Sequence, residues 1–273
     1  MSIPSCIEDL IKNSGNHFHS KVARWLVDDG WHVIVSPYYM DQTQGKAREI
    51  DIVAEKPLAS VSNSFGRCGE IMVRLFVECK YVSTPSVFWM ASKCMKRAEE
   101  IVHRTGIYGP QWSDTKKHHY MEGAPVAKVF ASSKSKQSEN EPFYRALNQV
   151  LNAMVSMRGR PPHIPQPDQA PRSGCKVHVL EFPVVVCSSF ESLYATDFYD
   201  EAAARPMSGA FQLEVSYAYT DKKGNGREEC FLIDFVDFGN IRGFVALLEE
   251  DAKGAAHIIE LRETMQKDSF YYR

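Results

Sequence analysis

Two segments in which acidic and apolar residues alternate constrain the fold of this chain most strongly. They are residues 48–54 and 71–82, and in a β-strand successive side chains point to opposite faces. The sequence therefore predicts two strands, with Glu49 and Asp51 sharing one face of the first and Glu78 and Lys80 one face of the second. Charged side chains are rarely buried among apolar neighbours unless they are paired or bind a metal. The alternative is that Glu78 and Lys80 form a simple ion pair on a solvent-facing sheet.

The segments around these strands predict a mixed α/β fold. Helical and strand periodicities follow one another early in the chain, and strands dominate later, with no internal repeat. The expected early elements are a helix over 18–28 ended by Gly30, a strand over 31–39, a polar turn at 41–46, a loop at 60–69 and a helix over 85–103. Lys56-Pro57 is expected to end the strand over 48–54. The expected later elements are a loop at 106–123, a strand at 126–131, a helix over 142–157, strands at 176–187, 211–219 and 229–238, the last two as a hairpin, and a helix around 243–250 with a short helical tail.

Five prolines between residues 161 and 171 form the one segment that resembles a linker, because proline suits neither helix nor central strand. We therefore expect a core over residues 1–158, a proline-rich connection over 159–175, and C-terminal strands and a helix over 176–273 that extend or cap the same domain.

Composition places the chain among globular proteins of the cytoplasm. It has 273 residues and a net charge of −2, and its seven cysteines include no Cys-x-x-Cys pair, which argues against a disulfide framework or a zinc ribbon. No apolar run reaches the roughly 18 residues of a membrane span, and the first residues lack the features of a secretory signal. We expect no membrane partner, and the charge balance neither demands nor excludes nucleic acid.

The order of these features resembles the PD-(D/E)XK nuclease superfamily. In that family an aspartate ends or follows one strand, and Asp/Glu-x-Lys lies on the neighbouring strand. The segments Phe18-His19-x-x-Val22 and Gly30-Trp31-x-Val33 are similar to the opening of Mrr-like and resolvase-like members. The catalytic motif corresponds to Glu49-Ile50-Asp51 and, 27 residues after Asp51, to Glu78-Cys79-Lys80. Ile50 replaces the proline that often precedes the aspartate in the family.

The resemblance implies a restriction-endonuclease-like mixed central sheet flanked by helices, here with a C-terminal antiparallel hairpin extension. It also implies an endonuclease that hydrolyses phosphodiester bonds with magnesium, for which manganese could substitute. Asp51, Glu78 and the backbone carbonyl of Cys79 are the expected metal ligands. Lys80 would position the attacking water and offset charge in the transition state, because its ammonium should stay protonated beside two carboxylates.

Two further residues are candidates for an outer role at this site. His19 stands where many family members carry a glutamate, and it could hold a metal-bound water or cap the sheet. Glu49 could support the metal site, or it could pair with Arg48 or Lys46 on the surface.

Basic residues after Lys80 are candidates for contacts with nucleic-acid phosphates, which dominate non-specific affinity. A solvated helix face, shared with Glu99 and Glu100, is the alternative for the first three. The candidates are Lys93, Lys96, Arg97, Lys116 and Lys117. The adjacent His118 and His119 are not expected to form a metal site, because neighbours in sequence seldom converge on one ion and no acid is spaced to join them.

The expected partner is nucleic acid, with DNA favoured over RNA, in a homodimer or as a subunit of a defence or repair complex. The competing hypothesis is a module of the same fold that binds nucleic acid or protein without catalysis, as a subunit of a larger complex.

Overall fold

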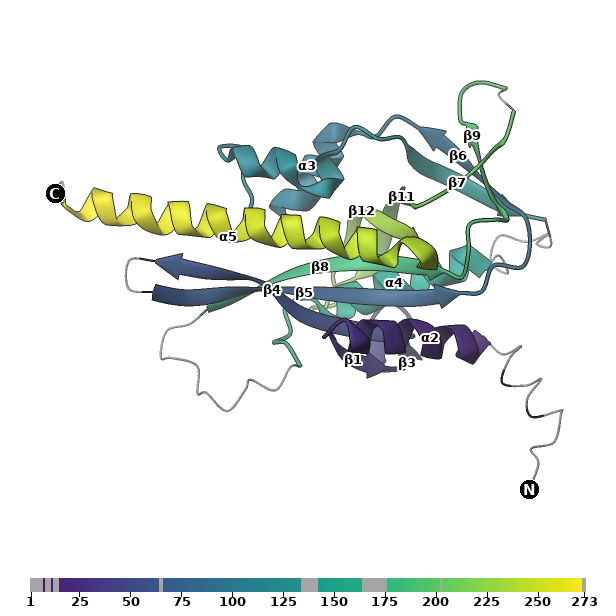
Figure 1. Cartoon of the computed structure of the whole chain (residues 1–273), viewed down its shortest axis with the longest axis horizontal. Helices are drawn as coiled ribbons and strands as arrows, with labels where there is room; N and C mark the ends of the chain where they lie inside the picture. Colours follow the sequence, from purple (N-terminus) through teal and green to yellow (C-terminus); the bar gives the residue numbers. More distant parts are fainter. Residues whose placement is uncertain are drawn as a thin grey trace.

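The structure of the chain, a computed structural model, describes Ile7, Ile11 and residues 15–63, 66–133, 142–163, 176–201 and 203–271. These residues form a mixed α/β structure in which helices cover both faces of a large mixed sheet (Figure 1). The longer helices are α2 (Gly15–Asp28), α3 (Met95–His103), α4 (Pro142–Met157) and α5 (Ile241–Tyr271). In this part of the chain, no helix is both long and apolar enough to cross a membrane.

Ten strands of the described residues form the main sheet. Along the chain they are β1 (His32–Val35), β4 (Ile52–Asn63), β5 (Gly66–Lys80), β6 (Ser86–Ala91), β7 (Val126–Ser132), β8 (Lys176–Cys187), β9 (Leu193–Asp197), β10 (Arg205–Pro206), β11 (Ala210–Thr220) and β12 (Gly226–Asp237). Their order in space is β1-β4-β5-β8-β12-β11-β7-β6-β9-β10. The strands β2 (Tyr38–Asp41) and β3 (Lys46–Glu49) form a separate hairpin.

Three parallel strands, β5, β8 and β12, lie at the centre of the sheet. The pairing of β8 with β5 extends from Gly69↔Lys176 to Lys80↔Cys187, whereas β8 and β12 pair only from Asp234↔Val184 to Asp237↔Cys187. On the other side of β5, β1 and β4 continue the sheet in antiparallel fashion. The carboxyl ends of the three parallel strands therefore meet at one edge of the sheet.

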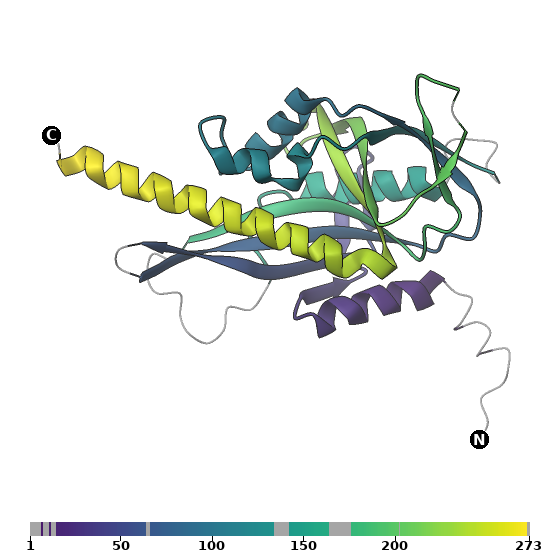
Figure 2. The same ribbon diagram turned by 45° about the horizontal axis from the view of Figure 1, so that its top comes forward.

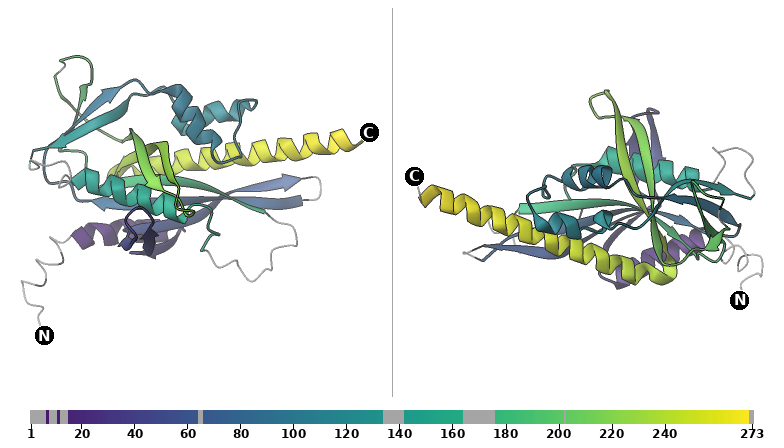
Figure 3. Two further views of the ribbon diagram at one scale, coloured as in Figure 1. Left: turned by 180° about the vertical axis from the view of Figure 1, so that it is seen from behind. Right: turned by 90° about the horizontal axis from the view of Figure 1, so that it is seen from above.

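Each face of the sheet has its own apolar core. Side chains of α2 and α5 pack on one face, against residues such as Ile52 and Val77. Figure 2 shows α5, in yellow, crossing in front of the strands, with α2, in purple, below it. Side chains of α4 pack on the other face, against Val53 and Phe76, and α4 is seen over the sheet from behind in Figure 3. Helices on both faces leave the strand ends as the open part of the sheet.

The helix α2 ends as its sequence predicts. Gly30 adopts the left-handed conformation with φ of 85°, and its N–H donates to the carbonyl of Val27 while the N–H of Trp31 donates to that of Leu26. This pair of bonds satisfies the last carbonyls of the helix. The prediction of a helix over 18–28 ended by Gly30 is confirmed.

The prediction of a loop at residues 60–69 is wrong, because β4 and β5 form one long hairpin through this segment. A register shift between Pro57 and Ala59 accommodates the proline that was expected to end the strand, as β-bulges commonly do. Val61 is buried within the hairpin. Gly69 is required there, since a Cβ at this position would lie 2.8 Å from the carbonyl oxygen of Lys176.

Three other expected elements are divided in the structure. The strand expected over residues 31–39 becomes β1, which ends at Val35, and the start of β2 in the separate hairpin. Residues 48–54 are the end of β3, a bend at Ile50 and Asp51, and the start of β4. The helix expected over residues 85–103 begins with the strand β6 and becomes helical only at Met95. Short apolar segments such as residues 86–91 fit either element by periodicity, and pairing of β6 with β7 and β9 decides for a strand here.

The later elements follow the sequence prediction closely. α4 and β8 have the expected bounds, β7 extends one residue past the expected strand, and β11 and β12 form the expected hairpin. The helix expected around 243–250 is the beginning of α5, which continues to Tyr271. The proline-rich segment falls largely outside the described residues, and the strands that follow it pair within the same sheet as β4 and β5.

Candidate active site

Asp51, Glu78 and Lys80 come together at the carboxyl end of β5. The pairing of Ile52 with Val77 brings Asp51, in the bend before β4, beside Glu78 on the neighbouring strand. This edge, where β5, β8 and β12 end, is where open α/β sheets commonly bind ligands.

The side chains of Glu78 and Lys80 point to the α4 face of the sheet because they lie two and four residues after Phe76 along β5, and Phe76 packs on that face. Ile50 also packs in the core of this face, whereas Ile52 packs in the opposite one. The uninterrupted alternation predicted over residues 48–54 is therefore wrong, since the bend at Asp51 reverses it.

Hydrogen bonds between the two strands hold the acidic residues in place. Asp51 Oδ2 accepts a bond of 2.8 Å from the Cys79 N–H, and Glu78 Oε1 accepts one of 3.3 Å from the Asp51 N–H. Lys80 Nζ donates to Glu78 Oε2 over 3.3 Å. The backbone of Cys79 thus fixes the carboxylate of Asp51. The backbone of Asp51 and the side chain of Lys80 fix that of Glu78.

The positive charge near Glu78 is too small to compensate for the burial of its carboxylate. The residue is 1% exposed, and burial together with the nearby charge of Asp51 raises its pKa to about 8, although Lys80 opposes this shift. Burial also raises the pKa of the Cys79 thiol, and Asp51 and Glu78 raise it further, which disfavours a thiolate nucleophile here. When Glu78 is ionised, one ammonium faces two carboxylates, and another cation would correct this deficit of positive charge.

The donor atoms at this edge are oxygens of the kind that hard divalent cations bind. Asp51 Oδ1 has no hydrogen-bond partner within the described chain, and the two oxygens of Glu78 are engaged only at 3.3 Å. The Cys79 carbonyl lies on the same side of β5 as its N–H, which faces Asp51. Carboxylate and carbonyl oxygens are the ligands that magnesium prefers.

His19 contacts the backbone of this site rather than its carboxylates. It lies in α2, and its Nε2 donates to the carbonyl oxygen of Asp51 over 2.8 Å. The Ser36 N–H donates to the same oxygen, with Ser36 at a φ of 52°. Two roles were considered for His19, holding a metal-bound water or capping the sheet. The observed bond to the Asp51 carbonyl corresponds to the second role.

Glu49 lies in β3, on the hairpin next to the site. Its carbonyl oxygen accepts a bond from Gln149 of α4, and within the described residues its side chain bonds to none of Asp51, Glu78 or Lys80. Arg48 pairs with the buried Asp41 over 2.8 Å instead of with Glu49. A supporting role for Glu49 in metal binding stays a prediction.

The structure does not bring the expected nucleic-acid contacts to this edge. Lys93 is buried and precedes α3, and its ammonium donates to the carbonyls of Tyr120 and Glu122, so it offers no charge to a phosphate. Arg97 pairs with Glu214. Figure 1 shows α3 over the middle of α5 rather than at the carboxyl end of β5.

Lys96 and Lys116 are exposed, and Lys117 pairs with Asp114 over 2.6 Å in the short 3₁₀ helix η1 (Ser113–Lys117). Because they are exposed, Lys96 and Lys116 can contact a phosphate. They lie in α3 and η1, away from Lys80 at the end of β5.

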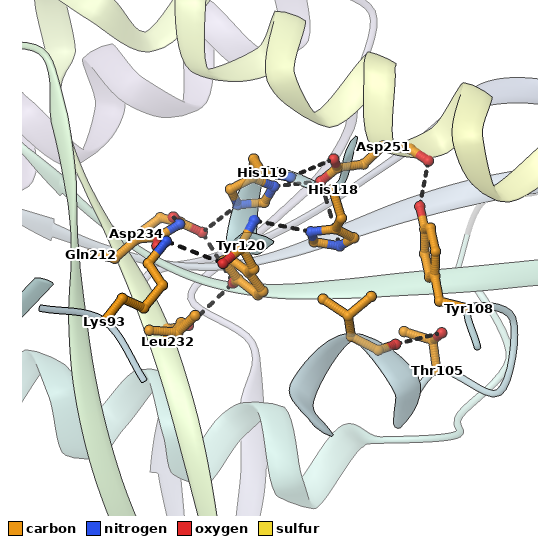
Figure 4. A network of polar contacts seen from close by, with 11 residues as sticks. Lys93, Thr105, Tyr108, His118, His119, Tyr120, Gln212, Leu232, Asp234 and Asp251 are labelled. Carbon is orange, nitrogen blue, oxygen red and sulfur yellow. Dashed lines mark hydrogen bonds and ion pairs between the residues drawn. The ribbon is translucent and has the colours of Figure 1, made fainter. Parts of the chain in front are cut away.

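A second cluster of ionisable residues, which sequence reasoning missed, lies in the core beneath α5 (Figure 4). His119 sits between two buried carboxylates: its Nδ1 bonds to Asp251 and its Nε2 lies 3.4 Å from Asp234. Tyr120 donates to Asp234 over 3.1 Å. The adjacent histidines signal this cluster weakly, but nothing in the sequence links them to Asp251, 132 residues beyond His119.

His118, His119 and Asp251 lie close enough to hold a metal, but their hydrogen bonds argue against one. Nδ1 of His118 accepts the Tyr120 N–H, so its neutral ring carries the proton on Nε2, the nitrogen that faces Asp251. Both nitrogens of His119 face carboxylates, as in a doubly protonated ring.

The protonation states within the cluster agree with this interpretation. Burial alone would lower the pKa of His119, but Asp251 and Asp234 raise it to about 10. Burial lowers the pKa of His118 to about 3. The cluster is therefore a buried imidazolium held between two carboxylates.

The chain matches no protein-family model, no curated protein and no solved structure.

Proposed function

We propose that the chain is a magnesium-dependent endonuclease of the restriction-endonuclease-like fold, with its active site at Asp51, Glu78 and Lys80. The observation that carries the proposal is the convergence of two carboxylates and one ammonium at the carboxyl end of β5, on the strands where the PD-(D/E)XK motif predicts them. The mixed sheet with helices on both faces agrees with such a fold.

Asp51 and Glu78, with the Cys79 carbonyl, would hold the metal. When bound, magnesium or manganese would neutralise the phosphodiester, activate water and stabilise the leaving oxygen. The Cys79 N–H fixes one oxygen of Asp51 and leaves the other oxygen available. The Asp51 N–H fixes Glu78 in the same way, so the two carboxylates keep their relative position.

Lys80 would orient the attacking water and offset charge that develops on the phosphate. Its side chain is 20% exposed while that of Glu78 is 1% exposed, so the ammonium lies between the buried carboxylate and solvent. His19 would act indirectly, because its bond to the Asp51 carbonyl fixes the bend that presents the aspartate.

DNA is the favoured substrate on the family resemblance. The test is cleavage of supercoiled plasmid, single-stranded circular DNA and RNA by the full chain with magnesium or manganese. Asp51→Asn, Glu78→Gln and Lys80→Met should each reduce the rate by at least about a hundredfold, the loss typical for one electrostatic catalytic group.

Matched controls are Asp28→Asn and Lys176→Met, which remove the same charges from exposed positions away from the carboxyl end of β5. They should cleave like the unmodified protein. Equal rates in the three site variants and the controls would contradict the proposal. Tight DNA binding without cleavage under every metal would instead favour the non-catalytic module.

A further inference from the structure

A cavity of about 430 Å³ lies where the parallel strands β8 and β12 separate. The two strands pair only over their last four residues, and before Val184 and Asp234 they diverge. Helices α3 and α4 contribute side chains to the opening. The volume falls in the range of small-molecule sites.

The inner wall of the cavity is apolar and aromatic, with a few fixed polar groups. His118, Tyr120 and Leu232 line this wall. Tyr120 Oη donates to the Leu232 carbonyl over 3.1 Å, a contact drawn in Figure 4. The apolar lining residues include Ile101, Met154, Leu180, Phe182, Phe231 and Leu232. A flat apolar molecule would replace water against this wall.

Two arginines, Arg104 directly after α3 and Arg158 directly after α4, lie at the mouth of the cavity. The guanidinium carbons of Arg104 and Arg158 lie 5.0 Å and 5.7 Å from the centre of the Phe231 ring. Both arginines pair with the same carboxylate, Glu229, and their side chains are 32% and 35% exposed. The other lining carboxylate, Glu181, pairs with Arg74.

Because Arg74 is shared between Glu55 and Glu181, the three guanidinium groups and three carboxylates here balance. The excess positive charge at the mouth comes from the ammonium of Lys222, which donates to the Arg158 carbonyl over 2.8 Å. Within the described residues Arg158 donates only through Nη1, so its Nε and Nη2 remain available. A guanidinium with a free edge binds carboxylate or phosphate oxygens well.

We propose that this cavity binds a small planar aromatic molecule that carries one anionic group. The aromatic body packs against Phe182 and Phe231, and the carboxylate or phosphate binds Arg158 at the mouth. The site lies where β8 and β12 diverge, between α3 and α4, whereas Glu78 and Lys80 on β5 are level with the segment from Val184 to Cys187 where β8 and β12 pair. The proposal is therefore independent of nuclease activity.

Isothermal titration of the full chain with three probes tests the proposal: 2-naphthoate, 2-naphthyl phosphate and the neutral 2-naphthalenemethanol. We expect at least one anionic probe to bind about tenfold or more tightly than the neutral one. Whichever anion binds more tightly identifies the anionic group as carboxylate or phosphate.

Arg158→Met keeps the apolar stem and removes the charge. It should weaken the anionic probe about tenfold and leave the neutral probe unchanged, while Met154→Trp, which fills the cavity, should abolish binding of all three. Arg145→Met, at an exposed position of α4, the helix that Arg158 follows, is the matched control and should bind like the unmodified protein. Absence of binding by every probe, equal affinity of the charged and neutral probes, or equal effects of the two arginine variants would overturn the proposal.

Discussion

Replacing Glu78 by glutamine should stabilise the protein when divalent metal is removed. The folded carboxyl has a pKa of about 8 against an ordinary value of 4.5, chiefly because burial disfavours its charged form. The folded state therefore binds more protons than the unfolded state between these values, and stability falls as pH rises from 4.5 to 8.

The size of the effect follows from the pKa shift. At pH 7 the 2.5 pH units above 4.5, at about 1.36 kcal/mol each, correspond to roughly 3 kcal/mol that burial of Glu78 costs. Glutamine has no charge to desolvate and can still accept the Asp51 N–H, so Glu78→Gln should recover up to about 3 kcal/mol at pH 7 and little at pH 4.5.

Urea unfolding in EDTA at pH 4.5, 6 and 7 measures this difference, with the exposed Glu191→Gln as control. Magnesium should reverse the ranking: the unmodified protein gains about 2.7 kcal/mol at a hundred times the dissociation constant, and Glu78→Gln gains much less. A variant less stable than the unmodified protein throughout this pH range in EDTA would refute the reasoning.

Two further substitutions test the buried ion pairs. Arg74 is 1% exposed and pairs with Glu55 and Glu181, so Arg74→Met should cost about 3–5 kcal/mol in urea unfolding by removing the cation that both carboxylates share. The raised pKa of His119 gives stability that is complete below pH 6.5 and lost as pH rises towards 10, and His119→Gln should abolish this pH dependence between 7 and 10.

The site could be predicted from sequence because its residues are close along the chain. Two strands joined by a hairpin bring Asp51 beside Glu78, and alternation along one strand places Glu78 and Lys80 on one face. The bend at Ile50 and Asp51 was not predictable in this way, because it depends on the separate β2–β3 hairpin and on bonds from His19 and Ser36.

Contacts between distant segments account for what the sequence did not reveal. The ion pair of His119 with Asp251 needs α5 to pack over the sheet, and the burial of Lys93 needs the carbonyls of Tyr120 and Glu122 nearby. Lys93 follows a short apolar segment that fits a helix or a strand equally by periodicity. Its position therefore depends on strand pairing, which local sequence does not specify.

The balance of charge distinguishes the two ionisable clusters. In the core cluster the His119 imidazolium lies between Asp234 and Asp251, so the chain itself supplies the cation that both carboxylates need. At the end of β5 the single ammonium of Lys80 contacts Glu78 alone, and burial keeps the pKa of that carboxyl high. Folding gains nothing from such a deficit, since a buried carboxylate without full compensation is destabilising. A cation from solution would remove the deficit, and this is why the smaller, more exposed cluster is the better candidate for catalysis.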